Sequence, residues 1–514
     1  CTSDAQCIDG YLCRSDGRCS PEAFETVWEV GETDRIVDFP VQYLRACDFR
    51  IEWGDGTAPE AHTSCPNELK HEYAEAGQYR VRITGVIDGW TMCDGLSIGI
   101  NNNANCWQSS CSNKLKEIAS FGPVKMGRAV FSQCKTPIKM PLNDVPNAES
   151  LEYMDRYFDS ALVSGPIDHW DVSHALSFDR IFEKSDLKTS IVHWDTSNVR
   201  AMYGAFLSMK SDVDVSLWDV GNVVVMSSMF NGATKFDQNL SKWDTHSVTD
   251  MSSMFKDATS FNGDISGWDV SWVTNMSSMF KGATKFDQNL SNWKTHSVTD
   301  MSSMFKGATS FNGDISGWDV SRVTNMIQMF SGATEFNGNI SKWNVSQVVN
   351  MQELFNGATK FNQNLSNWKT HNVRNMSGMF IGATSFRGDI SGWDTHSVIE
   401  MSSMFKGATS FNGDISGWDT HSVIDMLSMF KGARSFNCDI SGWDVSEVRI
   451  MAEMFHGAMM FDQSLEKWNV RNTSSWKDFF KESGISKENY CKTIQNLVFK
   501  ENKDKLGISF VCEP

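Results

Sequence analysis

Aspartate recurs directly after a series of evenly spaced tryptophans, and carboxylates repeated at a fixed interval can bind metal ions. The candidate calcium ligands are Asp244, Asp269, Asp319, Asp394, Asp419 and Asp444. Stacked in a row about 5 Å apart, like charges repel by about 1 kcal/mol or more per pair near a surface. Bound calcium, which takes clustered oxygens, would offset this repulsion. Hydrogen bonds from backbone N–H groups and nearby serines would also do so. We favour hydrogen bonding and keep calcium as the alternative.

Histidine follows two residues after several of these positions and offers a second metal-binding chemistry. His246, His396 and His421 follow an aspartate in this way, and His296 and His371 occupy the same position after a lysine. They alternate irregularly with serine, and no fixed set of three ligands recurs. We therefore expect solvated or turn-capping histidines rather than a metal strip.

Catalytic motifs are not found in this sequence. It contains no phosphate-binding glycine loop, no G-x-S-x-G and no H-E-x-x-H. Near-copies of whole segments, such as 249–268 and 299–318, argue against a single catalytic centre, which needs unique residues in one place. We expect a protein that is not an enzyme and that has no cofactor other than the calcium considered above.

Composition and charge restrict the partners. The 514 residues carry 46 Lys and Arg against 63 Asp and Glu, a net charge of −17. A polyanion such as nucleic acid is therefore not an expected partner. No apolar run approaches the ~18 residues of a membrane-spanning helix. The first residue is cysteine and no apolar leader follows, so we expect a processed or partial chain.

Cysteines indicate an oxidising, extracellular compartment. Ten of the 13 lie between Cys1 and Cys134, and the first four are spaced by six. The expected disulfide cysteines are Cys1, Cys7, Cys13, Cys19, Cys47, Cys65, Cys491 and Cys512. Pairing does not follow from spacing, although Cys47–Cys65 and Cys491–Cys512 would close local loops. Because the total is odd, one thiol is free or pairs outside this chain.

The element that positions all these residues is a tandem repeat marked by tryptophan. Tryptophans from Trp170 to Trp468 are separated by two steps of 24 and then ten of 25. A fixed period of this length predicts a solenoid of thirteen coils. The predicted core ladder is Trp243, Trp268, Trp293, Trp318, Trp343, Trp368, Trp393, Trp418 and Trp443.

Each coil is expected to contain a short strand and a short helix. Trp268 and Val270 alternate like a strand. Apolar residues then recur at three, four and seven, as on one side of a helix: Met276, Met279, Phe280 and Ala283. The glycine two residues after Phe280 is placed for a left-handed backbone.

The repeat W-D-V-S-x-V-T-x-M-x-x-M-F-x-G-A-x-x-F-N resembles the 25/26-residue repeat of bacterial surface proteins, a relative of the BspA-like leucine-rich repeats. The resemblance covers about residues 160–468. It implies a leucine-rich-repeat-like solenoid, a secreted or cell-surface location, and a role in adhesion to a host or matrix.

The flanking segments have patterns of their own. W-G-D-G-T at 53–57 and A-G-x-Y-x-V-x-I at 76–83 resemble PKD-like immunoglobulin-type modules, which implies an extracellular spacer. In that segment Asp55 is better explained by turn geometry than as a calcium ligand. Apolar residues after Trp468 follow helical spacing and predict a helical cap. The expected domains are a Cys-rich module (1–23), a PKD-like β-sandwich (24–92), a linker and cap coil (93–160), the solenoid (161–468) and the C-terminal cap (469–514).

Glycosylation follows only if the protein is secreted by a eukaryote. The candidate sequons begin at Asn239, Asn275, Asn289, Asn339, Asn344, Asn364, Asn375 and Asn472. The leading hypothesis is a non-enzymatic extracellular or cell-surface protein that gives a rigid surface for adhesion to a protein or glycan. The alternatives are a subunit of an extracellular filament or coat, which would bind copies of itself, and a calcium- or carbohydrate-binding module.

Overall fold

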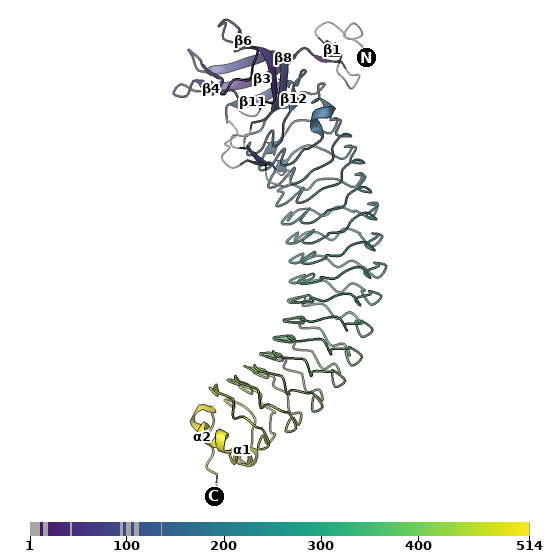
Figure 1. The fold of residues 1–514 in the computed structure, drawn as a ribbon, viewed down its shortest axis with the longest axis vertical. Helices are drawn as coiled ribbons and strands as arrows, with labels where there is room; N and C mark the ends of the chain where they lie inside the picture. The colour runs from purple at the N-terminus through teal and green to yellow at the C-terminus, as the bar shows by residue number, and fades with distance from the viewer. Residues whose placement is uncertain are drawn as a thin grey trace. The chain divides into compact units, whose positions relative to one another are not determined.

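The structure is a computed structural model that describes residues 11–13, 19–41, 44–92, 96–98, 104–106, 113–134 and 136–512. It divides into two compact units, residues 1–248 and 249–514, which are described separately below. The first unit contains a β-domain followed by coils, and the second contains coils and two short helices (Figure 1).

Strands make up most of the regular structure as far as Met126. They are β1 (Tyr11–Cys13), β2 (Cys19–Pro21), β3 (Ala23–Val30), β4 (Ile36–Asp38), β5 (Ala46–Glu52), β6 (Glu60–His62), β7 (Lys70–Glu72), β8 (Gly77–Trp90), β9 (Leu96–Ile98), β10 (Ala104–Cys106), β11 (Leu115–Ser120) and β12 (Lys125–Met126). The pairs β1–β2, β4–β7 and β9–β10 are antiparallel.

The main sheet has the order β11-β3-β8-β5-β6, with β12 pairing in parallel along β8. Alternate residues of β3 and β5 are buried, as expected for a sheet with one face on a core. Aromatic rings fill that core: the ring of Phe24 lies 4.8 Å from that of Trp90, and Trp28 lies 6.0 Å from Phe39. The resemblance to a PKD-like module remains a prediction.

The sheet extends beyond residue 92, the boundary predicted from the sequence for the β-sandwich. Strand β11 pairs antiparallel with β3, Leu115 lying opposite Trp28. The same strand begins the stack of coils, because Glu117 forms a parallel bridge with Lys139. Non-local backbone pairing of this kind leaves no periodic signal in the sequence.

Coils continue through the rest of the first unit. Single-residue parallel bridges connect Tyr153 to Ser177 and Ser177 to Ala201. The two-residue strands β13 (Leu162–Val163) and β14 (Asp186–Leu187) also pair in parallel. The 3₁₀ turn η2 (Ala148–Leu151) begins where the side chain of Asn147 accepts a hydrogen bond from the backbone of Glu149.

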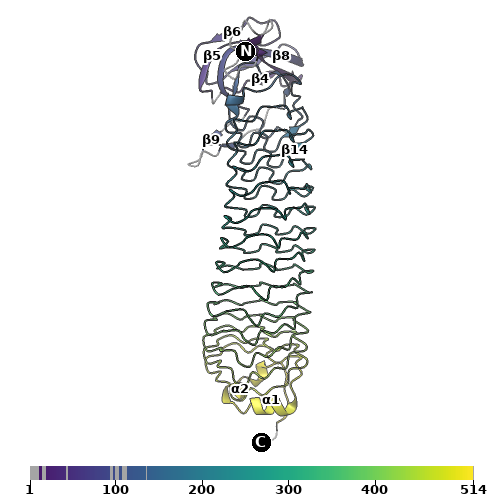
Figure 2. The ribbon, with the colours of Figure 1, turned by 90° about the vertical axis from the view of Figure 1, so that its right-hand side faces the viewer.

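In the second unit, equivalent residues of successive coils form bridges from Asp250 to Ser475, one per coil. Successive coils therefore lie one upon another, as both views show (Figures 1 and 2). The expected fold class, a leucine-rich-repeat-like solenoid with a strand and a helix in every coil, is wrong. In residues 249–512 the backbone contacts between coils are isolated bridges and turn hydrogen bonds, and the only helices follow residue 486.

The strand predicted at Trp268 and Val270 is not formed. The backbone N–H of Trp268 donates to the carbonyl of Ile265 at 3.2 Å, and that of Val273 donates to Val270 at 3.0 Å, so this edge is two turns. Tryptophan and valine still face inward, because each turn directs its apolar side chain to the core.

The helix predicted in each coil is replaced by consecutive β-turns. Met279 N–H donates to the carbonyl of Met276 at 3.2 Å, three residues back rather than four. Ser278 lies between the turns with φ +57°, in the left-handed region, which interrupts a right-handed helix. Phe280 N–H then donates to Met304 in the next coil at 2.8 Å. The spacing of three and four also fits such turns, so it did not distinguish them from a helix.

The predicted helical cap is also wrong for most of its length. Trp476, Phe479 and Phe480 lie in turns, and Phe480 N–H donates to the carbonyl of Leu506 at 2.8 Å. Helix is confined to α1 (Lys487–Thr493), α2 (Leu497–Glu501) and the 3₁₀ turn η3 (Lys503–Lys505). None of the helices in the described residues has the length and hydrophobicity that crossing a membrane requires.

Candidate functional site

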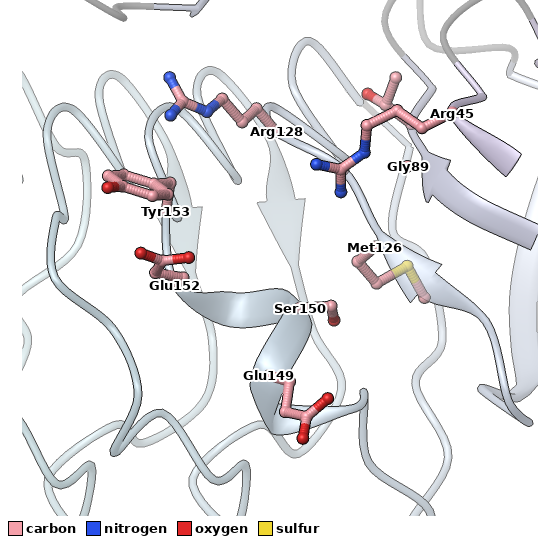
Figure 3. Close-up of a pocket in the computed structure, with 10 residues that line it drawn as sticks. Arg45, Gly89, Met126, Arg128, Glu149, Ser150, Glu152 and Tyr153 are labelled. Carbon is pink, nitrogen blue, oxygen red and sulfur yellow. The ribbon is translucent and has the colours of Figure 1, made fainter. Parts of the chain in front are cut away.

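A pocket of about 330 Å³ lies in the first unit where the end of β8 meets β12 and η2. Its walls include Arg45, Arg128, Glu149, Glu152 and Tyr153 (Figure 3). Figure 3 shows both arginine side chains above the η2 turn, Glu152 beside Tyr153 at one end of the turn, and Glu149 on its far side.

Close backbone approach forms the floor of this pocket. Gly127 N–H donates to the carbonyl of Trp90 at 2.7 Å. A Cβ atom at Gly127 would lie 2.7 Å from the carbonyl oxygen of Gly89, closer than side chains allow, so only glycine lets β12 pack here. Gly89 itself has φ +92°.

Both pocket arginines already face carboxylates. A guanidinium nitrogen of Arg45 lies 2.8 Å from Asp88, and one of Arg128 lies 3.5 Å from Asp155. Arg128 also covers the ring of Tyr153 at 4.5 Å. Because these charges are partly neutralised and Glu149 and Glu152 also line the pocket, it suits a polar ligand with both donors and acceptors better than a simple anion.

A network of charged side chains packs near the pocket arginine Arg128 and was not predicted from the sequence. Arg156 lies 3.0 Å from Asp159 and 3.3 Å from Glu183, and Arg180 lies 3.4 Å from Glu183. Glu183 is only 5% exposed. The available signal was the departure of these coils from the repeat, where Arg180 replaces the serine seen at Ser253. Buried pairs of this kind hold charges that would be costly if left alone.

Burial changes the protonation of this network. Burial raises the pKa of Asp155 and of Asp159, although hydrogen bonds from Ser177 and Ser160 oppose the effect. The pKa of Asp179 rises to about 6, first because the carboxyl is buried and second because Asp155 is near. These groups lie among packed coils, where removing one member of a charge pair would leave the other buried and uncompensated.

Asp55 lies in a turn of the first unit, as the sequence analysis favoured. It accepts hydrogen bonds from the backbone and hydroxyl of Thr57 at 3.0 and 2.6 Å, and its other oxygen lies 2.7 Å from His71. Burial raises its pKa, but these hydrogen bonds outweigh burial and lower the pKa to about 2. The ring of His71 stacks on Trp53 at 4.8 Å, which keeps the turn in place.

The six candidate calcium ligands all cap turns. Asp269, Asp319 and Asp444 each accept the backbone N–H of the serine two residues on, at 2.9 to 3.0 Å. Asp244, Asp394 and Asp419 accept the N–H of the following histidine in the same way. Hydrogen bonds from the serine hydroxyl first, and from the serine backbone second, lower the pKa of Asp319 and Asp444. These bonds supply the stabilisation that an ion would otherwise provide. Calcium binding here remains a prediction.

Three of the histidines join their aspartate to a serine. His396 lies 2.7 Å from Asp394 through Nδ1 and 2.9 Å from Ser397 through Nε2. The arrangement repeats at His421, and in the first unit at His246. The order Asp–His–Ser is that of a hydrolase proton relay. His396 and Asp394 are more than half exposed, however, so water solvates them, and the relay caps a turn.

The predicted tryptophan ladder lies in the core. Its nine members are 1% to 4% exposed. Trp268 and Trp293 stack with their planes 3° apart and centroids at 6.4 Å. The indole N–H of Trp293 donates to the carbonyl of Ile265 at 3.1 Å, which satisfies the polar atom of a buried ring.

The candidate sequon asparagines differ in accessibility. Asn275 and Asn375 are half-buried and form the bridges between coils. The exposed or partly exposed ones outside these bridges are Asn239, Asn289, Asn339, Asn344, Asn364 and Asn472. Glycosylation stays a prediction, and the bridging pair is the less suitable for it.

Disulfides close two of the expected loops. Cys47 bonds to Cys65 in the first unit, and Cys491 bonds to Cys512 in the second. Cys19 and Cys134 are also disulfide-bonded. Cys1 and Cys7 lie outside the described residues, as does the side chain of Cys13. Among the described cysteines Cys438 is free.

The coils are rich in turns, recur at the spacing of the tryptophans, and bury one indole each. This architecture is that of a repeat protein. Five overlapping segments match the family described as Mycoplasma protein of unknown function, DUF285: residues 126–211, 149–242, 200–318, 299–398 and 386–493. Together they cover more than half of the 514 residues, and the chain belongs to this family. No curated protein shows significant sequence similarity to it.

Proposed function

We propose that this is a non-enzymatic extracellular or cell-surface protein whose stacked coils present a rigid surface for adhesion to a protein or glycan on another surface. The observation that carries the proposal is the in-register arrangement of exposed polar side chains in the second unit. Asp287 N–H donates to the side chain of Asn262 at 2.9 Å, and Asn312 N–H donates to Asp287 at 2.8 Å. The same bond links Asn337 to Asn312.

These bonds keep the exposed column in one conformation. A side chain that is already fixed loses little entropy when it meets a partner, which lowers the cost of binding. Because equivalent groups recur once per coil, a partner with its own repeated groups can make many weak contacts at once. The affinity then comes from multivalency rather than from one strong site.

The cysteines and the resemblances support an extracellular location. Disulfides such as Cys47–Cys65 persist in oxidising compartments. The repeat resembles that of bacterial surface proteins, and residues 49–85 resemble modules that serve as extracellular spacers. The net charge of −17 favours a cationic or polar partner over another polyanion.

Removing whole coils tests this proposal. Deletion of residues 299–348 removes two complete repeats and joins Val298 to Val349, so each remaining coil keeps an equivalent neighbour. Beads carrying the full or shortened chain at equal density are applied to cultured epithelial cells and to mucin- or collagen-coated surfaces. Multivalent adhesion predicts that retention falls steeply, by more than the fraction of coils removed.

Two further results decide between the alternatives. Full-length beads that none of these surfaces retains would overturn adhesion. Beads that aggregate with one another, together with concentration-dependent sedimentation of the free chain, would favour the filament or coat subunit instead. Ellipticity and melting temperature of the shortened chain show that loss of retention does not come from unfolding.

A further inference from the structure

We propose a site for a transition-metal dication of the zinc class at Glu453, His456 and Asp478, near the end of the stack of coils. One ligand atom from each of these side chains can be chosen so that all three lie within 4.8 Å of one another, and no other group of three or more among the described residues meets this condition. The site is separate from the aspartates of the exposed edge and from the proposed adhesive columns.

The repeat itself marks these residues as unusual. Where Glu453 and Asp478 stand, most other coils have serine, as at Ser403 and Ser428, and one has Glu353. Where His456 stands, several coils have lysine, as at Lys406. Two carboxylates and an imidazole thus replace two hydroxyls and a cation, and they do so at three positions that the fold brings together.

The backbone holds two ligands in strained conformations. Glu453 has φ +57° and Asp478 has φ +54°, a region that non-glycine residues seldom adopt. Glu453 N–H donates to Lys477 in the next coil at 2.8 Å, and Asp478 N–H donates to Lys505 at 2.8 Å. His456 lies on the same turn as Glu453, because its N–H donates to the Glu453 carbonyl at 3.1 Å. The positions of all three are therefore set by the coils.

The side chains have free coordination capacity. The Nδ1 atom of His456 is buried and has no hydrogen-bond partner in the described structure, an unusual condition for a buried polar atom. Oε2 of Glu453 accepts hydrogen bonds from Lys431 at 2.7 Å and from Ser428 at 3.1 Å. The other carboxylate oxygen, Oε1, is therefore left for a metal.

The donor set selects the class of ion. An imidazole with carboxylates suits zinc, whereas calcium takes oxygen ligands alone. Ligands of zinc lie about 2.0–2.2 Å from the metal, so the three groups must move together by roughly 1 Å. Their side chains are mostly buried but keep some exposure, which leaves room for this adjustment. A dication neutralises the two carboxylates and releases Lys431 toward solvent. Glu482 lies outside this group of three, although its carboxylate lies 3.8 Å from His456 Nε2.

Bound metal would connect the last coils to the C-terminal segment. Glu453 and His456 belong to a repeat coil, whereas Asp478 belongs to the segment that bonds to Lys505 beyond α2. The end of a stack has no further coil to cover it, so a cross-link at this point opposes fraying.

Zinc titration of the full chain tests the proposal. Cys438→Ser serves as background, because it removes the thiol found free among the described residues. We expect calorimetry to show one Zn²⁺ bound per chain. The melting temperature should rise by about 5–10 °C when the free zinc concentration is 100 times Kd. His456→Gln should weaken binding at least tenfold and abolish this rise. Its melting temperature in chelator, unchanged from the parent, shows that the fold is intact.

Two matched variants sharpen the result. His421→Gln alters a histidine on the exposed edge of the same unit and should leave zinc affinity unchanged. Lys431→Met removes the cation that competes for Glu453 and should strengthen zinc binding several-fold. Bound Co²⁺ should show visible d–d absorption that His456→Gln removes. The proposal is overturned if the parent binds no zinc, if His456→Gln binds it as tightly as the parent, or if His421→Gln is the variant that loses it.

Discussion

The indole rings of Trp318 and Trp343 lie 6.3 Å apart with their planes at 2°, although they belong to successive coils. Each ring is at most 4% exposed, and the N–H of Trp318 donates to the carbonyl of Leu290 at 2.9 Å. The same relationship recurs at Trp293 and Trp318, at 6.0 Å and 3°. One ring per coil is therefore the repeating unit of the core.

Replacing Trp318 by alanine removes one ring from this column. We expect a loss of about 3–5 kcal/mol in the free energy of unfolding, because the cavity cannot close between two fixed coils. Lys256→Ala, at the surface of a coil in the same unit, should cost less than about 0.5 kcal/mol. Urea unfolding measures both. Equal midpoints for the two variants would contradict the inward position of the tryptophan.

Two glycines of the second unit should respond in opposite ways to alanine. A Cβ at Gly388 would lie 2.0 Å from the carbonyl oxygen of Gln363, so Gly388→Ala must displace backbone and should cost more than about 1 kcal/mol. Gly417 has an ordinary φ and nothing within 4 Å of its Cβ position. Gly417→Ala should be neutral or stabilising by about 0.4–1 kcal/mol. If the two variants lowered the melting temperature equally, the coils would be spaced more loosely than in the structure.

Asp179 of the first unit and the turn-capping aspartates of the second unit should contribute to the pH dependence of stability with opposite signs. The pKa of Asp179 in the folded first unit is about 6, raised by burial and then by Asp155, from an ordinary value of 3.8. The folded state therefore binds the proton more tightly, and this contribution to stability is complete below pH 3.8 and is lost as pH rises through 6. Asp179→Asn should remove that dependence in thermal unfolding between about pH 4 and 7. An unchanged pH profile would contradict the buried position.

In the second unit the sign is reversed. Hydrogen bonds from Ser321 and Ser446 lower the pKa of Asp319 and Asp444. The stability that these two carboxylates contribute is present above pH 3.8, their ordinary pKa. It is lost as pH falls through their lowered pKa values in the folded state. Unfolding of this unit, followed by hydrogen exchange of its coils, should become easier below about pH 4. Greater protection of these coils in acid would count against the turn-capping role.

The disulfide between Cys491 and Cys512, which are separated by 21 in the sequence, closes a loop at the C-terminal end. Cys491→Ser with Cys512→Ser should lower the stability of the second unit by about 3 kcal/mol, mainly because the unfolded chain gains freedom. Reductant should lower the melting temperature of the parent but not of the double variant. No difference between parent and double variant would show that α1 and α2 pack independently of the bond.

The repeat and its inward residues could be inferred because they depend on local periodicity. Trp293, Met279 and Phe280 recur at fixed intervals, and only stacking can bury so many large apolar groups in every repeat. The Asp319 turn was also accessible, since an aspartate two residues before a serine N–H is a local arrangement. The backbone conformation of the coil could not be inferred in this way. Met276 and Ala283 fit a helix and a series of β-turns equally well.

The amino-acid sequence by itself determined the period, the core columns and the acidic, disulfide-containing character of this protein, because each depends on residue type and spacing alone. Tertiary structure decided the rest. Ser278 and its equivalents adopt a left-handed backbone conformation because their N–H groups donate hydrogen bonds to the next coil. No single coil can form such a bond. The pairing of β11 with β3 and the meeting of His456 with Asp478 likewise depend on contacts between segments distant in the chain.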